Sequence, residues 1–346
     1  MILWIVIYYE RGMKLMKKIF SILFVFILIL FSIGHAETIN SIDSARELID
    51  LVSNAAISSE TTTQNKSDVG DFNPKFISNF IAIAAKYLDD NILLDDKEKQ
   101  GKLLAECFAE NITIPETVSS KTSNDYIGAK IMFMKEYGDN SVKIVASIYT
   151  APDRIDKLQI QDMPQLSWMD KRIVLGLVKN SNSRYGYSIT DYSLSGELSM
   201  ENEIEEYFQN NYFEYINSRF GFSMQLPTAF ESGISETEDG IKSTDNNSGT
   251  SLFVKTYENK EHWTAKSFYD SLIASGNKYA KLFEETNVVT EYEIKDDKTL
   301  IYKAYLFSDN NVYFANIEFD KVEFENYSLN FEYLKNTFMV LNNEIG

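Results

Sequence analysis

The chain has 346 residues, of which 44% are hydrophobic and 24% are charged, and its formal net charge is −18. This length and apolar fraction favour about two packed domains and argue against global disorder. The acidic balance argues against nucleic acid and anionic lipid as partners, because like charges repel.

The N-terminal residues have the three parts of a secretory signal peptide. Lys14, Lys17 and Lys18 precede an uncharged, mostly apolar run from Ile19 to Ile33. The run ends at Gly34-His35-Ala36, with small residues at the positions that a signal peptidase reads. The run is short for a membrane span, which needs about 20 residues. We therefore expect a signal over residues 1–36 with cleavage after Ala36, and the alternative is an uncleaved anchor.

The expected product of this cleavage is a secreted or periplasmic protein. Cleavage removes four basic residues and one acidic residue, which gives the mature chain a net charge of −21. No cysteine follows the apolar run, so a lipoprotein is not indicated. Glu-Arg-Gly before Met13 can be encoded by a purine-rich ribosome-binding stretch. We expect translation to start at Met13 or Met16.

The next residues predict helices. Residues 41–56 indicate a short amphipathic helix with a capping box of Ser44 and Glu47. The polar stretch 58–71 is interpreted as a linker. Asn73 and Pro74 have the pattern of an N-cap and first helical residue, and a further helix is expected over Asp95–Phe108.

From Tyr126 the apolar period changes from helical to alternating. Turns at Gly138–Asn140 and Asn180–Ser183 separate strand-like runs and predict two β-hairpins. The first half, residues 37–208, is therefore expected to be an α+β domain in which helices pack on an antiparallel sheet. Residues 199–211 predict an acidic helix that joins the two halves.

The stretch YFEYINSRFGFSMQLPTAF, residues 212–230, is interpreted as the start of a second domain, residues 209–346. Its apolar residues alternate with small or polar ones from Phe220 to Leu226, and Pro227 ends the run. A substrate groove would need aromatic side chains on an exposed face. Here they share the regular inward face of a strand.

The remaining residues predict strands, a helix, a meander of strands and a closing helix. Asp239-Gly240 indicates a hairpin turn. Thr264 caps a helix that ends at Gly276. Three strands are expected over Val288–Ile294, Leu300–Phe307 and Val312–Phe319, and Leu334, Phe338 and Leu341 mark the last helix.

This second half resembles the Mog1/PsbP-like α/β/α sandwich. The matching residues are Tyr215, Asn217, Gly221-Phe222-Ser223 and Pro227, followed by the same order of elements over about the last 135 residues. Members of that fold are mostly non-catalytic binding or assembly factors. The resemblance therefore implies an accessory role and assigns no active-site residue. No resemblance covers the first half.

Nucleophilic catalysis and zinc binding have little support in the mature chain. It contains one cysteine, Cys107, and one histidine, His262. Cys107 lies on an apolar helical face and His262 precedes a helix cap, so we interpret them as a core residue and a surface residue. One of each is too few for a disulfide or for a zinc site of Cys and His ligands.

Carboxylates are numerous, but their pattern singles out no site. Asp191 lies within a regular strand pattern, and the oxygen-rich loop at Asp245 lacks the Gly and Glu that a calcium-binding EF-hand requires, with Thr250 and Thr256 at those positions. Three acidic pairs could bind cations weakly, although such pairs are usually solvated. They are Asp89-Asp90, Asp95-Asp96 and Asp296-Asp297.

We therefore expect an exported bacterial α+β protein of two domains that acts by binding, without cofactor, catalytic or metal-ligating residues. Its expected partner is a protein or surface polymer of the cell envelope. The alternatives are a carboxylate-based glycan hydrolase and an inert envelope spacer. Two carboxylates facing each other in a deep cleft would favour the hydrolase, and shallow surface pockets would favour the binding protein.

Overall fold

The computed structural model describes residues 45–59, 63–64, 72–118, 125–194 and 200–341. The expected signal peptide with its start at Met13 or Met16, the cleavage after Ala36, and the Ser44 cap lie outside the described residues. Among the residues described, no helix is both long enough and apolar enough to cross a membrane.

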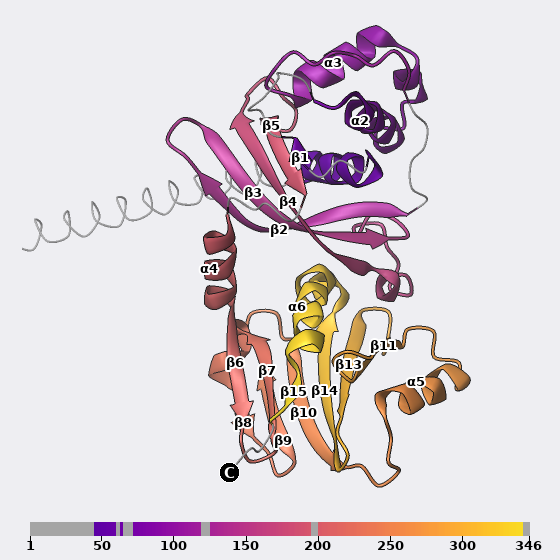
Figure 1. Ribbon diagram of the computed structural model, residues 1–346, viewed down its shortest axis with the longest axis vertical. Helices are drawn as coiled ribbons and strands as arrows, with labels where there is room; N and C mark the ends of the chain where they lie inside the picture. The colour runs from indigo at the N-terminus through magenta and orange to yellow at the C-terminus, as the bar shows by residue number, and fades with distance from the viewer. Residues whose placement is uncertain (1–44, 60–62, 65–71, 119–124, 195–199, 342–346) are drawn as a thin grey trace, which may run out of the picture.

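The first half is a five-stranded antiparallel sheet with helices packed on one face (Figure 1). Across the sheet the strands are β1 (Thr63–Gln64), β5 (Tyr187–Leu194), β4 (Ser167–Lys179), β3 (Ser141–Ala151) and β2 (Tyr126–Glu136). The helices are residues 45–59, α2 (Pro74–Tyr87), the 3₁₀ turn η1 (Asn91–Leu94) and α3 (Lys97–Cys107), and η2 (Met163–Gln165) lies between β3 and β4.

Local signals account for these helices and hairpins. The Asn73 side chain accepts a hydrogen bond from the Lys75 amide at 2.8 Å at the start of α2. Asp96 caps α3 by accepting from the Glu98 and Lys99 amides. The two predicted hairpins are β2–β3 and β4–β5. These predictions are confirmed.

The expected linker at 58–71 was partly wrong. Residues 58 and 59 belong to the helix over 45–59, and Thr63–Gln64 pairs with β5 opposite Ser193 and Tyr192. The edge of β5 presents unpaired backbone groups, which this short strand satisfies. The polar composition of the stretch gave no sign of that pairing.

The second half begins with a hairpin rather than with a single strand. The joining helix α4 (Glu201–Asn211) leads directly into β6 (Tyr212–Asn217). The boundary expected between residues 208 and 209 therefore falls within α4. A tight turn containing Phe220 and Gly221 connects β6 to β7 (Phe222–Pro227). Phe220 therefore lies in a turn and not in the strand whose alternation it appeared to begin.

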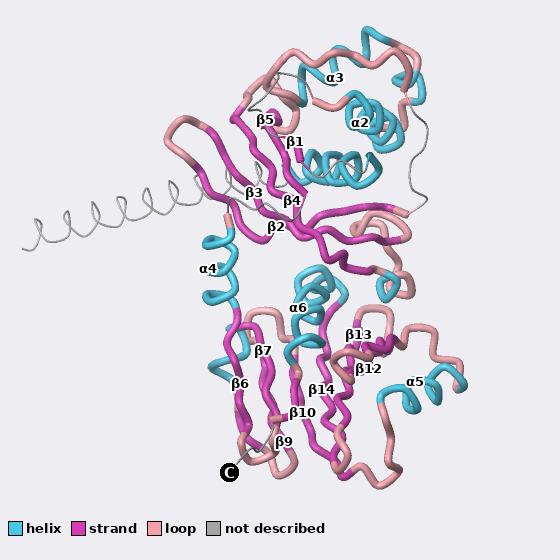
Figure 2. The backbone as a smooth tube through the Cα atoms, viewed as in Figure 1, coloured by secondary structure: helices cyan, strands magenta, loops and turns pink. Residues whose placement is uncertain are grey.

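The rest of the second half is a sheet between two helices (Figure 2). The 3₁₀ turn η3 (Thr228–Gly233) precedes a seven-stranded antiparallel sheet of, in spatial order, β11 (Lys281–Phe283), β12 (Val288–Ile294), β13 (Thr299–Phe307), β14 (Asn311–Asp320), β10 (Ser251–Glu258), β9 (Gly240–Thr244) and β8 (Ser235–Glu236). The helices are α5 (Ala265–Ala274) and, after η4 (Lys321–Glu323), α6 (Phe324–Thr337).

Alternate residues of β13 explain why the two helices lie on opposite faces. Tyr302 stacks on Phe331 of α6 with ring centroids 4.0 Å apart. Tyr305 and Phe307 point the other way and pack against Phe268 of α5. The layers are thus helix, sheet, helix, as expected for an α/β/α sandwich.

The closing helix was placed too late in the sequence. Phe338 and Leu341, which were expected within it, lie after its last residue, Thr337. Phe338 is extended and fully buried, and Met339–Val340 forms β15, which pairs with β7. The true apolar face of α6 comes from an earlier set of residues: Phe324, Tyr327, Phe331 and Leu334.

The two halves share one hydrophobic core cluster. Tyr126 and Tyr149 of the first sheet belong to the same cluster as Phe331 and the inner face of the second sheet. The loop between β3 and β4 adds Leu158, Met163 and Leu166. An apolar interface of this kind holds two halves in one relative arrangement.

Gly128 of β2 permits this shared packing, and Gly128→Ala is expected to lower the free energy of unfolding by about 1–3 kcal/mol. A Cβ at Gly128 would lie 2.4 Å from the ring of Tyr149 and 2.7 Å from that of Tyr126. Gly138→Ala is the matched control, because a Cβ there meets nothing within 4 Å. Calorimetric unfolding of both variants measures the difference, and equal effects would contradict this account.

Candidate functional site

Cys107 and His262, the two residues considered for nucleophilic catalysis, lie in different halves. Cys107 is fully buried at the end of α3, where burial raises the pKa of its thiol above the ordinary value. His262 is exposed just before α5, with a positive φ of 53°. They cannot form a catalytic dyad, since one belongs to the core of the first half and the other to the surface of the second.

The carboxylates considered from the sequence mostly support turns and caps. Asp191 accepts from the Thr190 hydroxyl at 2.9 Å within β5. Asp90 pairs with Lys99 at 2.8 Å, and Asp296 accepts from the amides of Lys298 and Thr299. Among the described residues, no group of three or more His, Cys, Asp and Glu is arranged to hold a metal ion.

The loop at Asp245 anchors α6. The Asp245 carboxylate accepts from the Tyr327 hydroxyl at 2.6 Å and from the Ser248 hydroxyl at 2.7 Å. It also accepts from the Asn247 amide at 2.9 Å. Its oxygens are therefore used by the protein itself, and the interpretation of this loop as a turn is consistent with these contacts.

A cleft of about 520 Å³ lies between the two halves. One wall is the start of β4, from Trp168 to Arg172, and the other is the side of α6 opposite to the residues that pack on the second sheet. Phe283 of β11 closes one side. The α6 residues on this wall recur at spacings of three and four, as one side of a helix requires: Leu329, Glu332, Tyr333, Lys335 and Asn336.

An irregularity in β4 shapes the first wall. Ser147 of β3 pairs with Arg172 of β4, and Tyr149 of β3 pairs with Trp168 of β4. The two β3 residues are two positions apart, whereas their β4 partners are four positions apart. The two extra residues on β4 bulge out of the ladder. Such bulges redirect side chains, and here Asp170 and Lys171 lie exposed at the cleft.

Aromatic rings hold the Arg172 side chain in place. Its guanidinium lies over the Phe208 ring of α4, 5.4 Å from the centroid, and donates to the Tyr333 hydroxyl at 3.4 Å. Tyr333 also lines a second hollow of about 420 Å³ beside β6 and β7, together with Phe208 and Tyr212. Arg172 and Tyr333 therefore lie where the cleft meets the second hollow.

The cleft brings acidic and basic side chains from three elements together. Glu332 pairs with Lys335 on α6, and the Lys335 ammonium lies 4.2 Å from the centroid of the Phe283 ring. Lys281 of β11 is close enough to Glu332 and Lys335 for their charges to act on it. Asp170 and Glu332 are two carboxylates on facing walls.

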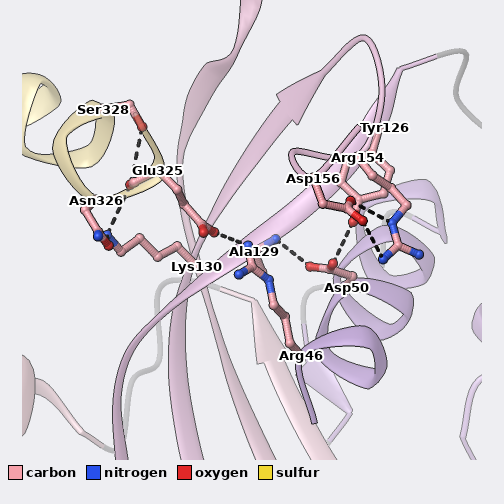
Figure 3. Close-up of polar contacts among 10 residues, drawn as sticks. All are labelled: Arg46, Asp50, Tyr126, Ala129, Lys130, Arg154, Asp156, Glu325, Asn326 and Ser328. Atoms are coloured by element: carbon pink, nitrogen blue, oxygen red, sulfur yellow. Dashed lines mark hydrogen bonds and ion pairs between the residues drawn. The ribbon is translucent and has the colours of Figure 1, made fainter. Parts of the chain in front are cut away.

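A second polar cluster lies at the start of α6 (Figure 3). Asp50, on the helix over 45–59, is 6% exposed and accepts from the Tyr126 hydroxyl at 2.6 Å and the Ala129 amide at 2.8 Å. Burial raises the pKa of Asp50 to about 7, although both hydrogen bonds and the Arg46 charge act in the opposite direction. Asp50 also lines a small hollow of about 260 Å³ beside Arg154 and Asp156.

This cluster links the first helix to α6. Arg46, one turn before Asp50, forms an ion pair with Glu325 (Figure 3). Lys130 of β2 donates to the Glu325 carbonyl at 3.1 Å and to the Asn326 side chain at 3.0 Å. Burial lowers the pKa of Lys130 to about 8. These contacts fix the position of α6 against the first half.

Sequence patterns did not single out the residues of either site. Asp50 is one acidic residue in an amphipathic helix, and Arg172 lies in an alternating strand. A signal for Asp50 was available, because it is the one charged residue of the apolar run Leu48–Val52. A carboxylate there must be buried or must end the helix.

Asp50→Asn is expected to remove a pH dependence of stability. The folded state retains the Asp50 proton up to a pH of about 7, whereas the unfolded chain loses it near its ordinary pKa of about 4. Between these values the unfolded state binds fewer protons, so the free energy of unfolding falls as pH rises. Asp50→Asn should lack this loss. As the pH rises from 5 to 7.5, the free energy of unfolding of the variant minus that of wild type should therefore increase by about 2 kcal/mol or more.

Urea unfolding at the two pH values measures this change. Asp156→Asn is the matched control, because Asp156 lines the same hollow but its side chain is 59% exposed. The same pH dependence in wild type and Asp50→Asn would show that Asp50 is ionised throughout the range.

Comparison with known proteins finds a likeness of fold alone. No family model matches the chain, and no curated protein matches it. The chain is similar to the solution structure of cyanobacterial PsbP (CyanoP) from Synechocystis sp. PCC 6803, with a TM-score of 0.30 and 10% sequence identity. The match covers 38% of this chain and 93% of that chain. The second half was expected from the sequence to resemble the same Mog1/PsbP-like fold.

Proposed function

We propose that this chain is an exported, non-enzymatic binding or accessory protein of the bacterial cell envelope, and that it binds its partner in the cleft between β4 and α6. The signal-like N-terminus supports export. The strong negative charge argues for a partner other than nucleic acid or an anionic membrane surface.

The observation that carries the proposal is the construction of the cleft from both halves. Its walls are a bulged strand of the first sheet and the outer face of α6, which the second sheet supports. Clefts where two structural units meet are frequent binding sites, because a ligand there contacts both units. The volume of about 520 Å³ lies within the range of about 300–1,000 Å³ usual for ligand sites.

One observation favours glycan hydrolysis as a second candidate function, since Asp170 and Glu332 line facing walls of this cleft. A glycosidase needs one carboxylic acid that holds its proton and a second ionised carboxylate. Glu332 is instead paired with Lys335. Of the carboxyl groups described, Asp50 has a raised pKa, and it lies in a different hollow. Binding therefore has the better support.

Site-specific photo-crosslinking tests the binding role. A benzophenone amino acid at Asn336, which is exposed on the cleft wall, should give crosslinked products in cells of the source bacterium. The same group at Lys242, exposed on β9 and outside the cleft, is the control and should give none. Equal products at both positions would contradict the use of the cleft, and none at either would favour an inert spacer.

Carboxylate substitutions test the hydrolase. If the chain acts by binding, the wild-type protein should release no reducing ends from cell-wall glycans. Turnover that is lost in both Asp170→Asn and Glu332→Gln, while folding is retained, would establish hydrolysis and overturn the binding proposal.

A further inference from the structure

Two basic side chains that line the cleft, and a third beside it, form no ion pair among the described residues. Lys171 and Arg172 of β4 line the cleft, and Lys281 of β11 lies two residues before Phe283, which also lines it. The ion pairs of the described chain include none of the three. The chain as a whole has a large excess of acidic residues, so unpaired cations grouped between its halves are unexpected.

Lys281 is the most informative of the three. It is mostly buried, and its pKa is lowered by this burial and by the charge of Lys335, while Glu332 acts in the opposite direction. It lies two residues before Phe283, so both side chains leave β11 on the side that faces α6. A partly buried ammonium that forms no ion pair is disfavoured, and an anionic ligand would offset part of that cost.

Arg172 is held ready for a planar anion. Phe208 and Tyr333 fix its guanidinium, which leaves few conformations to lose on binding. A guanidinium matches the two oxygens of a carboxylate or a phosphate with two parallel hydrogen bonds. The cleft therefore presents an oriented donor pair, with Lys171 next to it on β4.

The other groups in the cleft distinguish between these anions. Asp170 and Glu332 would repel a doubly charged phosphate, but they can accept hydrogen bonds from hydroxyl groups. Ser147 and Asn336 add further neutral polar groups. Trp168 provides an aromatic surface at the inner end, where its ring packs edge-on against Tyr149 with centroids 5.1 Å apart.

We propose that the cleft binds an acidic sugar, a hydroxylated ring that carries one carboxylate, with Arg172 and Lys281 on the carboxylate and Asp170 and Glu332 on the hydroxyls. Lys171 lies at the exposed rim and adds to the attraction. This inference rests on the proposed function, because it names the ligand class of the same cleft.

Calorimetric titration of the mature protein with digalacturonate tests the ligand class, with neutral galactobiose and inorganic phosphate as comparison ligands. Wild type should bind digalacturonate and neither comparison ligand. Arg172→Gln and Lys281→Met should each weaken binding about tenfold or more, as expected for loss of a charge-assisted hydrogen bond. Lys171 is exposed and has no packing role, so Lys171→Gln should weaken binding less. The effect of Lys171→Gln should also decrease as salt is added, because salt screens exposed charges. Lys242→Met is the charge-matched control and should bind as wild type.

Each remaining outcome counts against the acidic sugar. No binding of digalacturonate, equal binding of galactobiose, stronger binding of phosphate, or an equal loss in Lys242→Met would overturn the inference. Galacturonate monomer in a parallel titration separates a free sugar from a polymer as the source. If digalacturonate fails while Asn336 still gives crosslinks, the ligand class is wrong and the binding role stands. If both fail, the proposed function fails as well.

Discussion

The position of α6 between the two sheets is the constraint on which the rest of the structure depends. One face of this helix stacks on the second sheet through Phe331 and Tyr302. Its other face looks towards the first sheet and forms a wall of the cleft. The start of the helix is tied down by Asp245 through Tyr327 and by Arg46 through Glu325. A shift of α6 would disturb the shared core, the polar cluster and the cleft together.

The junction combines apolar packing with a buried charge, and the two have opposite effects on stability. Tyr126 and Tyr149 remove a large apolar area from water at the point where the halves meet. The same packing takes Asp50 out of water, which disfavours its charged form. Tyr126 contributes to both effects, because its ring packs in the core while its hydroxyl donates to Asp50. The core thereby supplies part of the compensation for the carboxylate that it buries.

Local sequence signals predicted most of the helices and strands. Tertiary contacts determined the features that these signals did not predict. Asn73 and Thr264 act on backbone amides within three residues of themselves, so their patterns were sufficient to start α2 and α5. Phe338 was misassigned because its helical spacing from Leu334 is real, yet its ring is buried against Phe222 and the chain is extended there. Arg172 and Glu332 are 160 residues apart in sequence. Only the fold, with an unpredicted bulge in β4, places them in one cleft.

The shape of the junction gives a physical reason for a cleft at this position. In one part of the junction, Tyr126 and Tyr149 of the first sheet pack into the cluster that also contains Phe331 of α6. Trp168 lies at the transition, with one edge in the packed cluster and the rest at the cleft. Beyond it the bulge moves β4 out of register, and charged side chains replace apolar ones. The cleft is thus the part of the junction that packing leaves open. A ligand there would contact both halves and would stabilise their arrangement by its binding free energy.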